Sequence, residues 1–143
     1  MRKWIIAAIA LAVLVVGGFY ALRMLSPPPA DLDVAREKMS AGGKYAVAIE
    51  PEAEPIQQGA LHGWIVTVKT PDGEPVSNAE ITVDGGMPQH GHGLPTVPQS
   101  VGHLGEGRYR IEGVRFNMGG WWVLKFAISA PAGNDEAEFN IVL

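Results

Sequence analysis

Residues 121–130 read WWVLKFAISA, and in this stretch a large apolar residue occupies every second position from Trp122 to Ile128. Successive side chains of a β-strand point to opposite faces, so this alternation places one apolar row on one face. Residues 64–69, WIVTVK, repeat the pattern from Trp64 to Val68. Each stretch therefore predicts a strand that offers one face to a hydrophobic core.

The same period of two continues through the C-terminal two thirds of the chain. It predicts six strands, at residues 45–50, 61–70, 79–84, 107–116, 121–130 and 136–143. The composition of the turn Pro71-Asp72-Gly73-Glu74-Pro75 predicts a hairpin between two of them. Short alternating strands without helical segments between them favour an all-β fold, an immunoglobulin-like antiparallel β-sandwich, with a small barrel as the main rival.

The N-terminal segment has a different character. Residues 4–22, WIIAAIALAVLVVGGFYAL, contain no charge, and as a helix they would span roughly 28 Å, which is close to the hydrocarbon thickness of a bilayer. Arg2 and Lys3 precede this stretch, so residues 1–3 are expected in the cytoplasm and the rest of the chain beyond the membrane. A cleaved signal peptide is the competing interpretation, although length and flanking residues favour an uncleaved transmembrane anchor.

Residues 23–43 are expected to form a linker between the anchor and a β-domain at residues 44–143. Three consecutive prolines, residues 27–29, favour a stiff, extended spacer. Asp31 or Asp33 is a candidate N-cap for a short helix through Ser40, which Gly42 and Gly43 would end.

Charge and composition exclude several classes of protein. Residues 31–143 carry 8 basic and 15 acidic groups, without the clustered basic side chains that bind nucleic acid. The chain has no cysteine, so disulfides and thiolate metal sites are excluded. The known catalytic motifs of nucleotide-binding proteins, serine hydrolases and zinc proteases are also missing from the sequence, and we expect that the protein is not an enzyme.

The most unusual segment lies between Asp84 and Glu106, where twenty-one residues, GGMPQHGHGLPTVPQSVGHLG, contain no charged side chain. Glycines and prolines within it disfavour regular structure, while its leucines and valines provide apolar points for docking on a sandwich. Long loops within compact domains are usually functional or disordered. We therefore expect an ordered but irregular loop.

Three of the four histidines fall in this segment, at His90, His92 and His103. In an extended chain His90 and His92 point to the same side, and the neighbouring glycines allow the backbone to aim both imidazoles at one point. Thioethers at Met87 and Met118 add soft donors, and imidazole with thioether suits copper better than zinc. Met87, His90, His92 and Met118 are therefore candidate copper ligands, and the role of His103 stays ambiguous.

Two alternatives to a copper site remain open. The histidines can instead donate hydrogen bonds to backbone carbonyls and hold the loop shut, while the methionines fill the core. The loop can also bind a partner without any metal. The fourth histidine, His62, begins a predicted strand and is expected to be structural.

Two separated motifs, residues 87–95 (MPQHGHGLP) and residues 116–122 (FNMGGWW), resemble those of the YtkA-like and FixH-like family of small membrane-anchored bacterial proteins. This resemblance implies an immunoglobulin-like sandwich similar to copper-handling sandwiches of the periplasm. It also implies a place at the inner membrane with the domain in the periplasm, and relatives that assist copper-pump and terminal-oxidase assembly. By position, the motif residues are Met87, His90, His92 and Met118.

Together these observations lead to two functional hypotheses. The first is a membrane-tethered periplasmic module that binds copper through the His/Met segment as a chaperone or sensor. The alternative is a metal-free assembly or interaction protein of a membrane complex, such as an oxidase or a pump.

Overall fold

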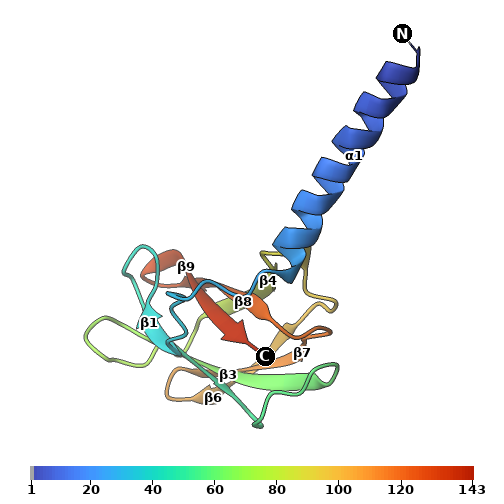
Figure 1. Cartoon of the computed structure of the whole chain (residues 1–143). Helices are drawn as coiled ribbons and strands as arrows, with labels where there is room; N and C mark the ends of the chain where they lie inside the picture. Colours follow the sequence, from blue (N-terminus) through green and yellow to red (C-terminus); the bar gives the residue numbers. More distant parts are fainter. Residues whose placement is uncertain (1) are drawn as a thin grey trace.

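A computed structural model describes residues 2–143 and consists of one helix and two β-sheets (Figure 1). Helix α1 comprises Arg2–Leu25. The nine strands that follow are β1 (Glu37–Met39), β2 (Ala46–Pro51), β3 (Leu61–Lys69), β4 (Glu80–Met87), β5 (His92–Gly93), β6 (Gln99–Gly105), β7 (Arg108–Arg115), β8 (Trp121–Ala130) and β9 (Gly133–Val142).

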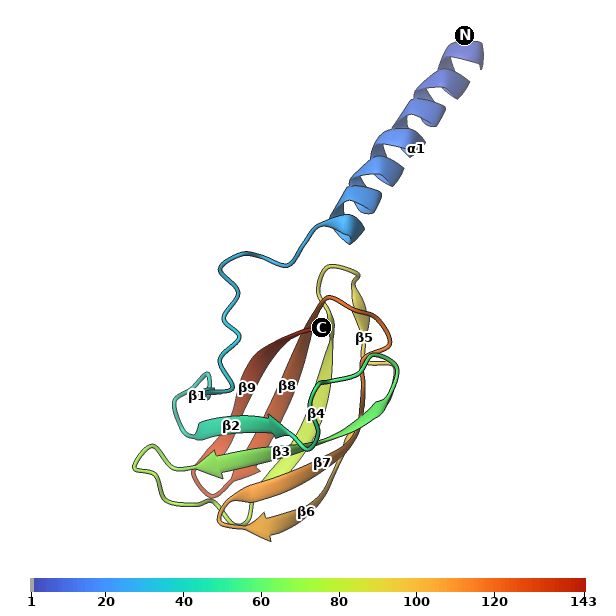
Figure 2. The same cartoon turned by 60° about the horizontal axis from the view of Figure 1, so that its bottom comes forward.

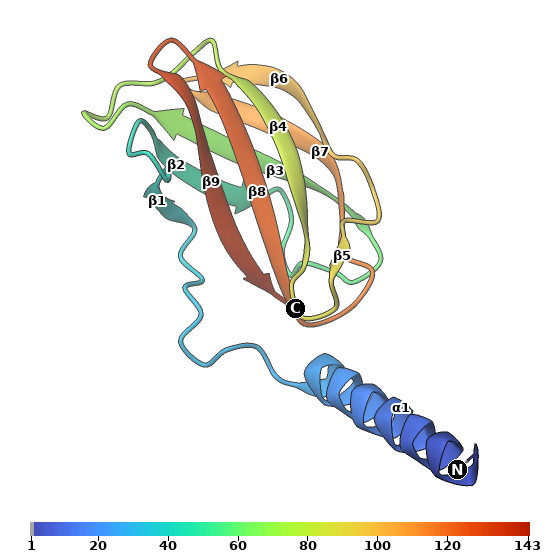
Figure 3. The same cartoon turned by 90° about the horizontal axis from the view of Figure 1, so that it is seen from above.

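The strands form two antiparallel sheets packed face to face, as Figures 2 and 3 show. One sheet has the order β1-β2-β3-β7-β6 and the other has the order β5-β4-β8-β9. The longest pairing joins β8 and β9, from Trp121 opposite Val142 to Ala130 opposite Gly133. The prediction of an all-β sandwich after a single apolar helix is confirmed.

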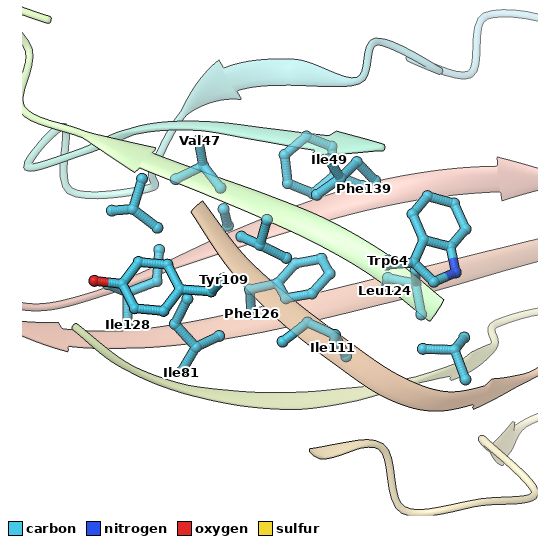
Figure 4. Packing of buried hydrophobic residues seen from close by; sticks show 14 of the residues in the cluster. Val47, Ile49, Trp64, Ile81, Tyr109, Ile111, Leu124, Phe126, Ile128 and Phe139 are labelled. Atoms are coloured by element: carbon cyan, nitrogen blue, oxygen red, sulfur yellow. The ribbon is translucent and has the colours of Figure 1, made fainter. Parts of the chain in front are cut away.

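The core lies between the sheets and is built by the alternating apolar residues (Figure 4). Trp64, Trp122 and Phe126 are fully buried, and the ring of Phe126 meets that of Phe139 edge-on at 6.0 Å between centroids. Burial of each side chain of this size stabilises the fold by about 1.5–3 kcal/mol. Tyr109, another buried aromatic residue, lies at the edge of this cluster.

The short helix expected within residues 23–43 is not formed. Asp33 accepts a hydrogen bond from the amide of Ala35 at 2.9 Å, in a turn rather than at a helix N-cap. Strand β1 follows and pairs with β2, with Lys38 opposite Val47. Because β1 forms ladder hydrogen bonds with β2 at the edge of the sheet, the first sheet begins at Glu37, before the expected boundary at residue 44.

The prediction of a hairpin around residues 71–75 is correct for the turn but wrong for the pairing of the flanking strands. The turn exists, because the Gly73 amide donates to the Thr70 carbonyl at 2.9 Å. The strands on either side of it, β3 and β4, nevertheless belong to different sheets. The hydroxyl of Tyr109 holds the crossover between them, since it donates to the Val76 carbonyl at 2.6 Å and accepts from the Ala79 amide at 2.9 Å.

The uncharged segment of residues 85–105 is more regular than expected. It extends β4 to Met87 and contributes strands β5 and β6. Strand β6 is an edge strand with two irregularities in its pairing to β7, and nearly all of its side chains are exposed. A strand without a buried face has no apolar alternation, which explains why the sequence pattern did not reveal it.

We call the end of the sandwich beside helix α1 the proximal end and the opposite end the distal end (Figures 2 and 3). Strand β4 reaches the proximal end at Met87, and β8 begins there at Trp121. The C-terminal residue Leu143 also lies at this end, where it exchanges two backbone hydrogen bonds with Gly120, at 3.0 and 3.1 Å. The C-terminal end of helix α1 thus lies beside the end of the domain that carries the His/Met segment, while the linker after the helix runs along the sandwich to β1 (Figures 2 and 3).

Within residues 2–143, helix α1 is the one helix long and apolar enough to cross a membrane. Its 24 residues correspond to about 36 Å of helix. A signal sequence near an N-terminus has the same features, so the helix is compatible with both an anchor and a leader.

Candidate metal site at the proximal end

A tight turn between β4 and β5 positions the two neighbouring histidines. The amides of His90 and Gly91 both donate to the Met87 carbonyl, at 3.1 and 2.9 Å, and this closes the turn. Gly91 has φ of +69°, a conformation that side chains disfavour, which explains why glycine stands between the histidines. Beyond the turn, His92 pairs directly with Met87 across the two strands.

The turn brings the two imidazoles together. The ring centroids of His90 and His92 are 5.8 Å apart and the rings are inclined by 43°. Imidazole nitrogens bind metals at about 2.0–2.1 Å, so two rings that share one ion have centres roughly 5 to 6.5 Å apart. The observed separation lies in this range. His90 is half-buried and His92 is exposed.

A backbone hydrogen bond determines which nitrogen of His92 is free. Its Nδ1 lies 3.0 Å from the carbonyl oxygen of Gly93. A carbonyl only accepts, so Nδ1 carries the proton and Nε2 keeps its lone pair. Metal-binding histidines commonly have their second nitrogen engaged in this way. The hydrogen bond therefore leaves Nε2 as the nitrogen of His92 that could bind a metal.

Trp122, which sequence reasoning did not include among the site residues, connects the candidate ligands. Its ring meets that of His92 edge-on, with centroids 5.7 Å apart. Its indole Nε1 donates to the carbonyl oxygen of Met118 at 3.0 Å. One buried side chain thus supports both the histidine turn and the connection that carries Met118. The Trp-Trp pair was visible in the sequence, but these partners were not.

The two candidate thioethers have different surroundings. Met87 is 1% exposed and belongs to the core, although it also lines the same pocket as His92. Its methyl group packs on Gly120, where a Cβ atom would come within 3.2 Å of it. Met118 is 37% exposed in the connection before β8. Core packing is therefore the main role of Met87, whereas the side chain of Met118 has access to solvent.

The remaining histidines lie apart from this turn. His103 is exposed on β6, in the other sheet, where its ring stacks on Tyr109 at 4.9 Å between centroids. His62 is buried, and its Nε2 lies 2.8 Å from the Gln57 carbonyl oxygen. The structure therefore does not bring His103 together with His90 and His92, and the contacts of His62 agree with a structural role.

The donor set narrows the choice of metal. Among residues 2–143 there is no group of three or more histidine, cysteine, aspartate or glutamate side chains that could hold an ion. An ion at this turn would thus have two imidazoles and would need sulfur or solvent to complete its coordination. Two nitrogens with a soft thioether fit Cu(I), whereas zinc usually takes additional imidazole, thiolate or carboxylate ligands.

A long-range contact ties the turn to the chain that leaves the helix. The side-chain Nε2 of Gln89 donates to the carbonyl oxygens of Ser26 and Pro27, both at 3.0 Å. More than sixty residues separate these partners, so no local sequence pattern indicates their contact. As a result, the histidine turn lies against the C-terminal end of helix α1.

The comparison with protein families gives one match. The family model described as YtkA-like matches residues 39–127, which is more than half of the 143 residues. This segment runs from the end of β1 into β8 and contains the histidine turn, Met118 and Trp122. Among curated proteins, none matches the chain.

Proposed function

This chain belongs to the YtkA-like family, and from that premise we propose that it is a membrane-tethered sandwich that binds Cu(I) at its proximal end, as a copper chaperone or sensor. In this proposal helix α1 serves as the anchor, and Arg2 and Lys3 at its N-terminal end favour an orientation with the sandwich on the periplasmic side. The ion is the cargo or signal, and the fold provides a rigid frame for its ligands.

The observation that supports this function best is the pairing of His90 and His92. Their ring separation of 5.8 Å suits two ligands of one ion. The Gly93 carbonyl keeps Nε2 of His92 free to bind, so no proton has to leave that nitrogen when the metal arrives. Two rings already at this separation need less movement to share an ion than rings on separate surfaces.

Sulfur ligands and low charge favour the cuprous ion. The segment from Gly85 to Gly105 contains no carboxylate that would attract a divalent cation. Thioethers are soft donors that select Cu(I) over harder ions. Affinity should decrease as the pH falls through the range in which histidines protonate, because a protonated imidazole cannot bind a metal.

The test measures Cu(I) affinity by competition with a chromophoric chelator, using the full chain in detergent. Replacing both histidines, His90→Ala with His92→Ala, should weaken binding by at least about tenfold per ligand, roughly a hundredfold in total. His103→Ala is the matched control, because it removes an exposed imidazole from the other sheet. Equal affinity of the double variant and the native protein would refute this function.

A metal-free assembly role is the second candidate. It is favoured by exposed apolar side chains on the sandwich, notably Val97 at 80% and Leu61 at 67% exposure. Such residues are typical of protein contact surfaces when they lie close together. This role predicts that the double histidine variant still co-purifies with the same membrane complex as the native chain, whereas Val97→Ser with Leu61→Ser does not.

A further inference from the structure

We propose that Met24, in the last turn of helix α1, supplies a sulfur ligand to the ion bound by His90, so that the metal site is shared between the anchor and the sandwich. This inference rests on the proposed Cu(I) function. It assigns a role to a residue of the anchor helix, far from both motifs in the sequence.

The two parts meet in a small pocket. Its volume is about 130 Å³, and it is lined by Tyr20, Arg23 and Met24 of the helix and by Gln89, His90 and Gly91 of the turn. Such a space exceeds the volume of about 30 Å³ that one water molecule occupies in the liquid. Figures 2 and 3 show the end of α1 beside the connection between β4 and β5. Met24 and His90 are therefore walls of one cavity of suitable size for an ion.

Hydrogen bonds hold the two walls together. Gln89, the neighbour of His90, binds the carbonyls of Ser26 and Pro27, only two and three residues after Met24. Ser26 in turn donates from its hydroxyl to the Leu22 carbonyl at 2.7 Å, which closes the end of the helix. The prolines that follow restrict the backbone. The distance between Met24 and His90 is thus limited by specific contacts as well as by the covalent linker.

The solvent exposure of the three thioethers favours Met24 as the sulfur ligand. Its side chain is 49% exposed, whereas Met87 is 1% exposed and packed in the core. Met118 is partly exposed, but its backbone is tied to Trp122; neither Met118 nor His92 lines the pocket that contains His90, although Gly91 between the histidines does. Met24 can therefore turn its sulfur toward an ion without opening the core.

The charge of Arg23 in the same pocket disfavours a divalent ion more than a monovalent one. A guanidinium near an ion repels a divalent cation twice as strongly as a monovalent one at equal distance. Arg23 also has a long aliphatic stem, which allows the charged group to move toward solvent or lipid headgroups. The positive charge weakens the binding of any cation, and in a pocket with Met24, His90 and Arg23 it should weaken the binding of Cu(II) more than that of Cu(I).

The test compares Met24→Leu with Met39→Leu in the full chain in detergent. Leucine keeps the apolar volume and removes the sulfur, and Met39 is a good control because it is 47% exposed on β1, away from the turn. We expect Met24→Leu to weaken Cu(I) binding about tenfold, with loss of copper–sulfur scattering in X-ray absorption, whereas Met39→Leu should change neither property. Near-ultraviolet circular dichroism confirms that both variants keep the native fold.

The outcomes separate this inference from the proposed function. If Met24→Leu retains both the affinity and the copper–sulfur scattering, Met24 is not a ligand, while binding through the histidines stands. If the double histidine variant binds Cu(I) as well as the native chain, the proposed function fails first. Gln89→Leu provides a second check, because it releases the histidine turn from Ser26 and Pro27. As a single substitution it should weaken Cu(I) binding. Added to Met24→Leu, it should weaken Cu(I) binding no further.

Discussion

The two ends of the sandwich use their polar groups in opposite ways. At the distal end, the carboxylate of Asp135 accepts hydrogen bonds from the Ser40 hydroxyl at 2.6 Å and from the amides of Gly42, Lys44 and Glu136 at 2.8, 3.1 and 2.9 Å. The hydrogen bond from Ser40 and those from the amides hold the pKa of Asp135 well below its usual range. Each of these groups has its partner within the protein.

At the proximal end, several atoms that could bind a metal have no hydrogen-bond partner or are exposed to solvent. Nε2 of His92 is left with its lone pair, and the side chains of Met24 and Met118 are partly exposed. The hydrogen bonds there, such as those from Gln89, hold backbone segments together and do not involve these metal-binding atoms. Under the proposed function, stability and Cu(I) binding would depend on different ends of one core. Substitutions at the distal end should change stability without changing Cu(I) affinity, whereas substitutions at the proximal turn should lower Cu(I) affinity at a smaller cost in stability.

The largest loss of stability is expected for Gly107→Ala at the distal end. Gly107 has φ of +71°, and a Cβ atom would lie 2.3 Å from the Val68 carbonyl oxygen, which is too close for any side chain. Strained backbone and steric overlap together should cost about 2–6 kcal/mol. Chemical unfolding followed by tryptophan fluorescence measures this loss. Native stability of this variant would show that the distal turn is looser than its contacts indicate.

A smaller loss is expected for Tyr109→Phe. This change removes the hydroxyl that binds the Val76 carbonyl and the Ala79 amide, and leaves one buried and one partly buried backbone group without this partner. The cost should be about 1–3 kcal/mol in the free energy of unfolding. Cu(I) affinity, measured on the same sample, should not change. A parallel fall in affinity would contradict the separation between the two ends.

Asp135→Asn should lower stability in a pH-dependent way. The pKa of Asp135 is depressed in the folded state, so its contribution is complete above the ordinary aspartate pKa of about 3.9 and decreases as the pH falls below that value. Melting temperatures of the native protein and the variant should therefore differ most at neutral pH and converge in acid. A difference that stays constant from pH 7 to pH 3 would rule out the charge of Asp135 as the cause.

The smallest effect on stability is expected for Gly91→Ala at the proximal turn. Gly91 has nearly the same φ as Gly107, +69° against +71°, but nothing lies within 4 Å of its added Cβ. Only the conformational cost remains, about 1–2 kcal/mol. Because Gly91 separates His90 from His92, Cu(I) affinity should fall more clearly than stability. Equal losses of stability in Gly91→Ala and Gly107→Ala would remove the distinction between the two turns.

The sequence predicted the fold where burial follows a period of two. The alternation around Trp64 and Trp122 located β3 and β8 closely, because each of these strands has one buried face. It missed β5 and β6, whose side chains are nearly all exposed, and β1, which is only three residues long. It also treated residues 71–75 as a hairpin, because turn composition does not indicate whether the next strand stays in the same sheet.

The candidate site was predictable in part. The sequence argument placed His90 and His92 on one side of an extended chain, whereas in the structure a tight turn with Gly91 at φ of +69° brings the two rings to 5.8 Å. The spacing of Met87 from the histidines did not reveal that Met87 packs in the core, because residue spacing does not show whether a thioether points inward or outward. The roles of Trp122, Gln89 and Met24 depend on tertiary contacts between distant segments, for which a single sequence contains no local signal.

The pairing of Leu143 with Gly120 has a practical consequence for every binding measurement suggested above. A purification tag fused after Leu143 would emerge next to the Met118 connection and the histidine turn. A polyhistidine tag at that point would offer its own imidazoles to added copper and mask the loss of His90 and His92. An imidazole-free or removable tag is therefore required if the titrations are to report on the native ligands.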